Sequence, residues 1–106
     1  MKQLEEYAKE FGVPEIVNDY GERRKTLPKS RIIFPNGWCA SIVNKSKYSE
    51  EPLYSVALCD YNGYFDWSTL VKFGSEPNGV FLCKTEDEII KACEVIRKLS
   101  DNGCVS

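Results

Sequence analysis

Apolar and polar positions follow helical spacing at both ends of the chain and strand-like spacing between them. Near the N-terminus, apolar side chains recur at helical intervals from Leu4 to Phe11, and charged side chains fill the positions between them. Gly12 follows directly, where a glycine commonly ends a helix. The pattern predicts a short amphipathic helix over residues 2–11.

The second predicted helix lies at the C-terminal end and begins at a capping box. Thr85 is followed three residues later by Glu88. The Thr85 side chain can accept a hydrogen bond from the Glu88 amide, while the Glu88 side chain reaches back to the start of the helix. Apolar side chains then recur at helical spacing over residues 89–99. Asn102-Gly103 is the predicted stop of this helix.

The middle of the chain predicts strands separated by Asn-Gly turns. Asn-Gly favours two-residue type I′ hairpins, because both residues tolerate positive φ. Such hairpins are predicted at 36–37 and 62–63, and the second would place Tyr61 opposite Tyr64. The third Asn-Gly, at 78–79, is either another hairpin or a loop. The predicted strands cover residues 31–34, 38–43, 53–60, 64–67 and 80–83.

These elements predict one α+β domain over residues 1–106, built on an antiparallel sheet of four or five strands. The C-terminal helix, 85–100, packs on one face of the sheet, and the N-terminal helix packs beside it or at the sheet edge. Residues 1–30 form the first helix and a polar arm, and residues 31–84 form the sheet.

The composition excludes several classes of function but does not identify one. The chain has 106 residues, a formal net charge of −2 and no histidine. The charge excludes a protein covered in basic residues, and the missing imidazole excludes Ser-His and Cys-His nucleophile pairs and histidine-ligated zinc. Asp60 and Asp66 near the second turn could act as an acid pair, but turn and strand-edge solubility also explain them. We expect no catalysis, no cofactor and no metal.

The five cysteines are an odd number without the close pairs of a zinc ribbon. Four of them lie in apolar runs, which predicts small buried side chains in a reduced cytoplasm. An activated thiolate is the alternative, and it requires a cationic neighbour in space. The N-terminus lacks the apolar segment of a secretory signal, and no run approaches the roughly 20 apolar residues that span a bilayer. We therefore expect a cytoplasmic protein without a membrane partner.

Two groups of residues are candidates for binding. The first is a basic run that contains Arg23, Arg24 and Lys25 and continues to Lys29 and Arg31. Such a run contacts phosphates or an acidic protein surface, or it is simply a solvated loop.

The second group is aromatic. A sheet with helices on one face leaves its other face open, and aromatics there would bind a partner or stacked bases. The alternative is that they form the core. Tyr61, Tyr64 and Trp67 are the ones expected to be exposed, since they cluster at a hairpin tip and its outgoing strand. The whole set comprises Trp38, Tyr48, Tyr54, Tyr61, Tyr64, Phe65 and Trp67.

Residues 34–43, 54–58 and 79–89 resemble segments of small accessory proteins of bacteriophage and prophage genomes. Those proteins carry a similar F-x-N-G-x-x-A-S strand pair, seen here from Phe34 to Ser41, a second hairpin and an acid-capped final helix. The resemblance covers about residues 31–99. It implies a phage accessory protein that binds and blocks a host or defence protein, as anti-CRISPR proteins do, and it supplies no functional residue.

These observations predict a non-enzymatic protein-interaction module, an inhibitor or modulator of a host or defence complex. The predicted binding residues are Arg23, Arg24, Lys25, Tyr61, Tyr64 and Trp67. The alternative is a small nucleic-acid-binding protein that uses the basic arm at 23–31. A homodimer formed through an edge strand is a further expectation.

Overall fold

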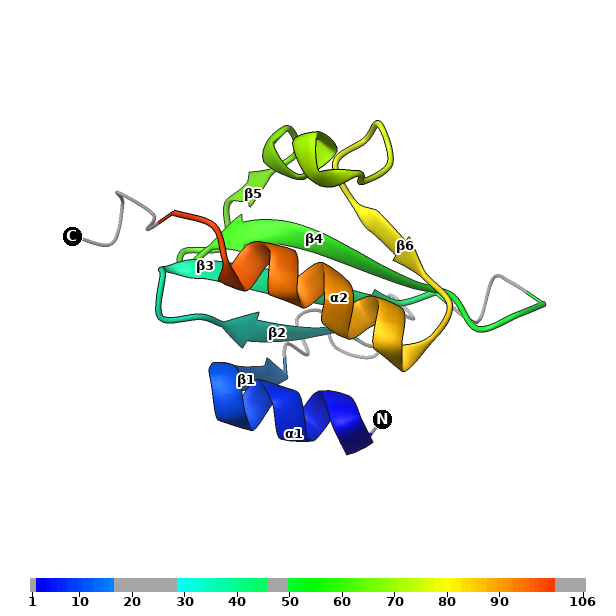
Figure 1. The fold of residues 1–106 in the computed structure, drawn as a ribbon, viewed down its shortest axis with the longest axis horizontal. Coiled ribbons are helices and arrows are strands. Elements are labelled where there is room, and N and C mark those ends of the chain that lie inside the picture. The colour runs from blue at the N-terminus through cyan, green and yellow to red at the C-terminus, as the bar shows by residue number, and fades with distance from the viewer. Residues whose placement is uncertain (1, 17–28, 46–49, 101–106) are drawn as a thin grey trace, which may run out of the picture.

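The computed structural model describes residues 2–16, 29–45 and 50–100, and these form two layers (Figure 1). One layer is an antiparallel sheet, and the other consists of two α-helices on one face of it. In chain order the elements are α1 (Lys2–Phe11), β1 (Val13–Ile16), β2 (Lys29–Ile33), β3 (Trp38–Asn44), β4 (Tyr54–Asp60), β5 (Phe65–Asp66), the 3₁₀-helix η3 (Thr69–Phe73), β6 (Phe81–Cys83) and α2 (Glu86–Arg97).

The sheet confirms the predicted α+β class. Its strands follow the order β1-β2-β3-β4-β5, every pair is antiparallel, and β6 pairs with the half of β4 that β5 leaves open. β1 is an edge strand that the sequence pattern did not predict. It has four residues and contains Pro14, whose missing N–H is tolerated at a sheet edge.

The core lies between the helices and one face of the sheet. Strand residues that alternate along β2, β3 and β4 meet the inner faces of α1 and α2 there. Leu70 of η3 closes the core at the β5 side. The largest fully buried side chains of this cluster are Phe34, Val56, Leu58, Leu70, Ile89 and Ile96.

The first two Asn-Gly turns lie where predicted, but they are one residue longer than predicted. The Gly37 amide donates to the carbonyl of Phe34 at 3.0 Å, and Gly37 itself is left-handed with φ of 87°. The second turn repeats this pattern, and Asp60 rather than Tyr61 lies opposite Tyr64. The predicted type I′ geometry and the predicted Tyr61–Tyr64 pair are therefore wrong. A three-residue loop with left-handed glycine at its third position replaces them.

The start of α2 is confirmed as a capped helix. The Thr85 hydroxyl accepts a hydrogen bond from the Glu88 amide at 3.2 Å, and the Glu88 carboxylate accepts one from the Lys84 amide at 3.1 Å. The carboxylate thus reaches back one residue further than in a standard capping box.

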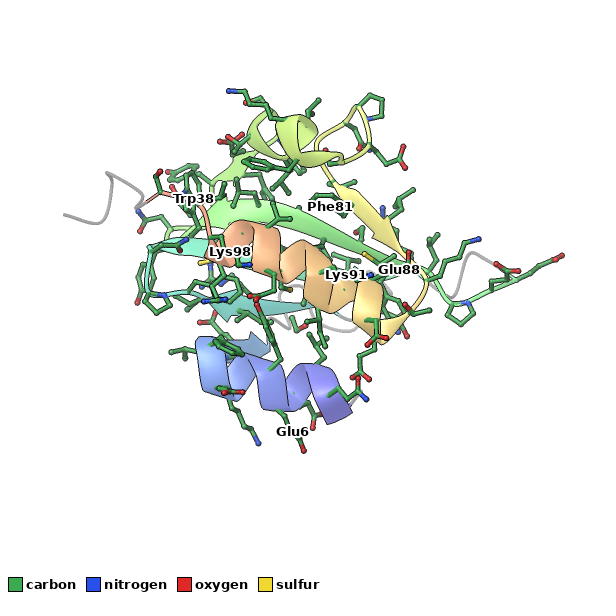
Figure 2. The ribbon with its side chains drawn as sticks, in the orientation of Figure 1. Glu6, Trp38, Phe81, Glu88, Lys91 and Lys98 are labelled. Carbon is green, nitrogen blue, oxygen red and sulfur yellow. The ribbon has the colours of Figure 1, made fainter. Side chains whose placement is uncertain are left out.

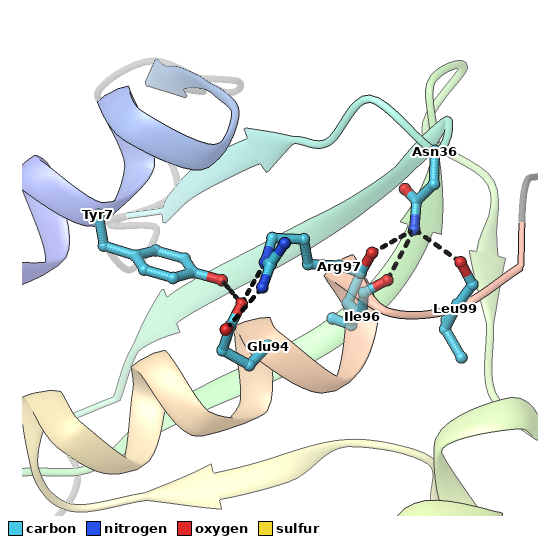
Figure 3. Close-up of polar contacts among 6 residues, drawn as sticks. All are labelled: Tyr7, Asn36, Glu94, Ile96, Arg97 and Leu99. Atoms are coloured by element: carbon cyan, nitrogen blue, oxygen red, sulfur yellow. Dashed lines mark hydrogen bonds and ion pairs between the residues drawn. The ribbon is translucent and has the colours of Figure 1, made fainter.

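The end of α2 differs from the prediction, because the helix ends at Arg97 rather than near residue 100. The side-chain amide of Asn36 donates to the carbonyls of Ile96, Arg97 and Leu99 at 2.9, 3.0 and 3.2 Å (Figure 3). The Trp38 indole N–H donates to the carbonyl of Ser100 at 3.1 Å. Figure 2 shows Trp38 beside this end of the helix. The first hairpin therefore binds the helix end before the predicted Asn102-Gly103 stop, which lies outside the described residues.

Polar contacts fix α1 beside α2 on the same face of the sheet. The Tyr7 hydroxyl donates to the Glu94 carboxylate at 2.6 Å, and Arg97 forms an ion pair with that carboxylate (Figure 3). The Arg97 guanidinium also lies 4.7 Å above the ring of Phe11. An isolated ten-residue helix is marginal in water, so these contacts and the burial of Tyr7 hold α1 in place.

Candidate interaction surface

Exposed apolar side chains gather in one stretch of the chain, around the β4–β5 hairpin and η3. Among the described residues, eight large hydrophobic side chains are exposed, and six of them lie between residues 61 and 73. We call this group the β5–η3 surface. It consists of Tyr61, Tyr64, Phe65, Trp67, Val71 and Phe73.

The β5–η3 surface contains an aromatic stack. The rings of Phe65 and Trp67 are nearly parallel, at an interplanar angle of 5° with their centroids 4.8 Å apart. Half of the Trp67 side chain remains exposed, at 53%. Stacking fixes the two rings relative to each other and leaves apolar area that a partner can cover.

Asp66 holds the backbone on either side of Trp67. One carboxylate oxygen accepts hydrogen bonds from the amides of Ser68 and Thr69 at 2.9 and 3.0 Å, and the other accepts one from the Thr69 hydroxyl at 2.7 Å. Burial alone would raise the pKa of Asp66, but these bonds, with one from the Ser68 hydroxyl, lower it to about 2. The carboxylate is thus charged at neutral pH and fixes the turn that leads into η3.

The third Asn-Gly turn lies against the backbone of Trp67. The Glu76 amide donates to the carbonyl of Val80 at 2.9 Å, and the Gly79 amide donates to Glu76 at 2.8 Å. The turn has the same three-residue form as in the two hairpins. No strand directly precedes it in the described residues and β6 pairs with β4, so of the two predicted alternatives this segment is a loop before β6. A β-carbon on Gly79 would lie 2.1 Å from the carbonyl oxygen of Trp67, so the two backbones are in contact.

The hairpin tip is tied to the rest of the sheet. The Tyr64 amide donates to the Asp60 carboxylate at 2.9 Å. Arg31 reaches across from β2, donates to the carbonyl of Tyr61 at 3.3 Å and forms an ion pair with Glu15 of β1 at 2.9 Å. Hydrogen bonds to the backbone of Tyr61 and Tyr64 therefore hold the hairpin tip in place.

The structure places only part of the predicted binding set. Tyr61, Tyr64 and Trp67 are exposed, at 61, 75 and 53%, as their position in the sequence indicated. Arg23, Arg24 and Lys25 lie outside the described residues, and so does Tyr48. Trp38 and Tyr54 are partly buried against the core.

Sequence reasoning missed Val71 and Phe73. Leu70, Val71 and Phe73 are apolar residues close together, which suggests a buried segment, but the 3₁₀-helix turns only Leu70 inward. Gly74 ends η3 in a left-handed conformation, with φ of 96°. Three apolar residues shortly before a glycine were the available signal, and they do not distinguish a helix turn from a strand.

The structure also places the two acids and four of the cysteines that the sequence offered as candidates for chemistry. Asp60 and Asp66 are not opposite each other, because Asp66 pairs with Leu58 and each carboxylate binds amides of its own turn. Cys39, Cys59, Cys83 and Cys93 are free thiols and buried, as predicted. No cluster of three or more potential metal ligands occurs among the described residues.

Comparison of the chain with protein-family models, curated proteins and solved structures gave no match. In the part of the chain that the structure describes, neither helix has the length and apolar character needed to cross a membrane.

Proposed function

We propose that the chain is a non-enzymatic interaction module that binds a partner protein through the β5–η3 surface. The observation that carries the proposal is the Phe65–Trp67 stack, exposed to solvent and held by Asp66 and Gly79. Exposed aromatics at the centre of an apolar patch are the side chains that contribute most to protein interfaces.

Rigidity supports this proposal as much as exposure does. Binding costs free energy when flexible side chains must be ordered, and a surface that is already fixed avoids much of that cost. The turn at Asp66, the contact of Gly79 with Trp67 and the bond from Arg31 to Tyr61 all act on this one surface.

The class of partner follows from the resemblance to phage accessory proteins. It points to a host or defence protein, with the chain acting as an inhibitor or modulator of a bacterial complex. The basic arm at 23–31 would add an electrostatic contribution to the same interaction.

Affinity capture from a bacterial lysate tests the proposal, with nuclease-treated and untreated samples read by mass spectrometry. We expect a protein that wild type retains after nuclease treatment and that the double variant Tyr64→Ala/Trp67→Ala loses. Val13→Ala/Leu82→Ala is the matched control, since both side chains are exposed but lie outside the β5–η3 surface. Recovery that vanishes with nuclease would instead support the nucleic-acid alternative, with the steep salt dependence of phosphate contacts.

A further inference from the structure

The sheet face opposite the helices carries two thiols in direct register. Cys39 on β3 and Cys59 on β4 are Cα partners across the central antiparallel pair, so their side chains project to the same side. They are 0 and 1% exposed. Residues directly opposite in such a pair have Cα atoms about 4.5 to 5.5 Å apart. A disulfide needs roughly 4.4 to 6.8 Å, so this backbone can accept one.

The two thiols interact with each other and with a nearby cation. Interaction with the Cys39 thiol lowers the pKa of Cys59. Burial opposes that shift, and the positive charge of Arg31 adds to it. A thiolate rather than a thiol is the nucleophile in sulfur chemistry, so Cys59 is the sulfur prepared to react first.

Arg31 is fixed next to this pair rather than free in solvent. Its guanidinium is held by Glu15 and by the carbonyl of Tyr61, and its side chain is 17% exposed. Its Nε and the hydroxyl of Ser41, the register partner of Arg31, are buried without a hydrogen-bond partner among the described residues. The positive charge therefore stays beside the two sulfurs.

We propose that Cys39 and Cys59 form a redox-active dithiol, which hydrogen peroxide oxidises to a disulfide between β3 and β4. The Cys59 thiolate attacks one peroxide oxygen, an S–O bond forms and the O–O bond breaks. The departing hydroxide takes up the proton that Cys59 released. The Cys39 sulfur then attacks the Cys59 sulfur, the S–S bond forms, and the S–O oxygen leaves as water with the Cys39 proton. The two thiols lose two electrons, and the peroxide is reduced to two waters.

The chain contains its own matched control in Cys83 and Cys93. These two thiols also lie near each other and are buried, but they face the core between the sheet and α2. Burial raises the pKa of Cys83 to about 11 and that of Cys93 to about 12. They stay protonated at neutral pH, so we expect them to remain reduced under conditions that oxidise the Cys39–Cys59 pair.

The test treats the folded full chain, carrying Cys104→Ser, with hydrogen peroxide and follows intact mass and peptide maps. We expect a loss of about 2 Da, a Cys39–Cys59 cross-linked peptide, and reversal by dithiothreitol. Cys59→Ser should abolish the cross-link, and Arg31→Gln should slow its formation about threefold or more. A chain that keeps both thiols reduced, cross-links Cys83 to Cys93, or gains only oxygen atoms would overturn the proposal. An unchanged rate in Arg31→Gln would remove Arg31 from the site.

Discussion

The backbone of Gly79 lies against the backbone of Trp67, so closely that a β-carbon on Gly79 would approach the Trp67 carbonyl oxygen to 2.1 Å and its Cα to 2.8 Å. The turn that contains Gly79 therefore positions the exposed indole, although the two residues are twelve positions apart. The contact joins the loop before β6 to the segment between β5 and η3, and both belong to the frame of the β5–η3 surface.

Gly79→Ala should destabilise the chain more than the corresponding change at a glycine with open surroundings. Gly63 has a similar φ, 91° against 88°, but nothing lies within 4 Å of its β-carbon position. Gly63→Ala should cost about 1 to 2 kcal/mol from the left-handed backbone alone. Gly79→Ala should cost clearly more and shift the tryptophan emission. Urea denaturation and fluorescence measure both effects, and equal losses in the two variants would show that the Trp67 contact does not matter.

Asn36→Ala should lower the free energy of unfolding by about 1 to 3 kcal/mol, because it removes the side-chain donor that the carbonyls of Ile96, Arg97 and Leu99 share. Asn36→Asp should cost at least as much, since it keeps the acceptor for the Trp38 amide but places a negative charge at the helix C-terminus. Asn62, at the matching position of the second turn, is exposed and serves as the control. A loss in Asn62→Ala as large as in Asn36→Ala would contradict this account of the helix end.

Acid stability should depend on Glu94. The hydrogen bond from Arg97, assisted by that from Tyr7, lowers the pKa of Glu94 to about 2, although burial opposes the shift. An unfolded glutamate titrates near about 4.3. The unfolded state therefore binds more protons, so the contribution of Glu94 is full above about pH 5 and is lost as the pH falls toward 2.

Glu94→Gln should accordingly lose less stability than wild type between pH 7 and pH 3, as followed by urea denaturation. Some acid dependence should persist, because Asp66 carries a shift in the same direction. Glu10→Gln, on an exposed position of α1, makes the same change in charge without these contacts. If Glu94→Gln retains the full acid dependence of wild type, the Tyr7–Glu94–Arg97 contacts do not contribute to it.

Local sequence signals predicted the positions of most elements, but neither β1 nor η3, and they predicted the details of the elements less well. Thr85 and Glu88 fixed the start of α2, because a capping interaction involves only neighbouring residues. The end of α2 depends on Asn36, some sixty positions away, and no local pattern contains that information. Asn-Gly marked each turn, but loop length depends on which flanking pair closes it, here Asp60 with Tyr64.

The candidate surface was predictable only in part for the same reason. Tyr61 and Tyr64 stand at a hairpin tip, where exposure follows from the turn itself. The exposure of Val71 and Phe73 depends on a 3₁₀-helix whose geometry is set by Asp66 and Gly74. Cys39 and Cys59 lie opposite each other because of the register between β3 and β4. The twenty residues between the two cysteines in the sequence do not reveal that register.

Trp67→Ala should weaken partner binding with little change in folding, because half of the side chain is already in contact with solvent. Surface substitutions usually change stability by no more than about 0.5 kcal/mol. The thermal midpoint should therefore move by no more than about 3 °C. A collapse of the midpoint would identify Trp67 as a core residue.

The most direct test of the β5–η3 surface compares the affinity of one captured partner for three purified chains, by titration calorimetry. These are wild type, Tyr64→Ala/Trp67→Ala and the control Val13→Ala/Leu82→Ala. The account predicts that the surface variant loses at least about tenfold in affinity, the cost of removing about 1.4 kcal/mol of contact. The control should bind as wild type does. Equal affinity of all three chains would contradict the claim that this surface is the binding site.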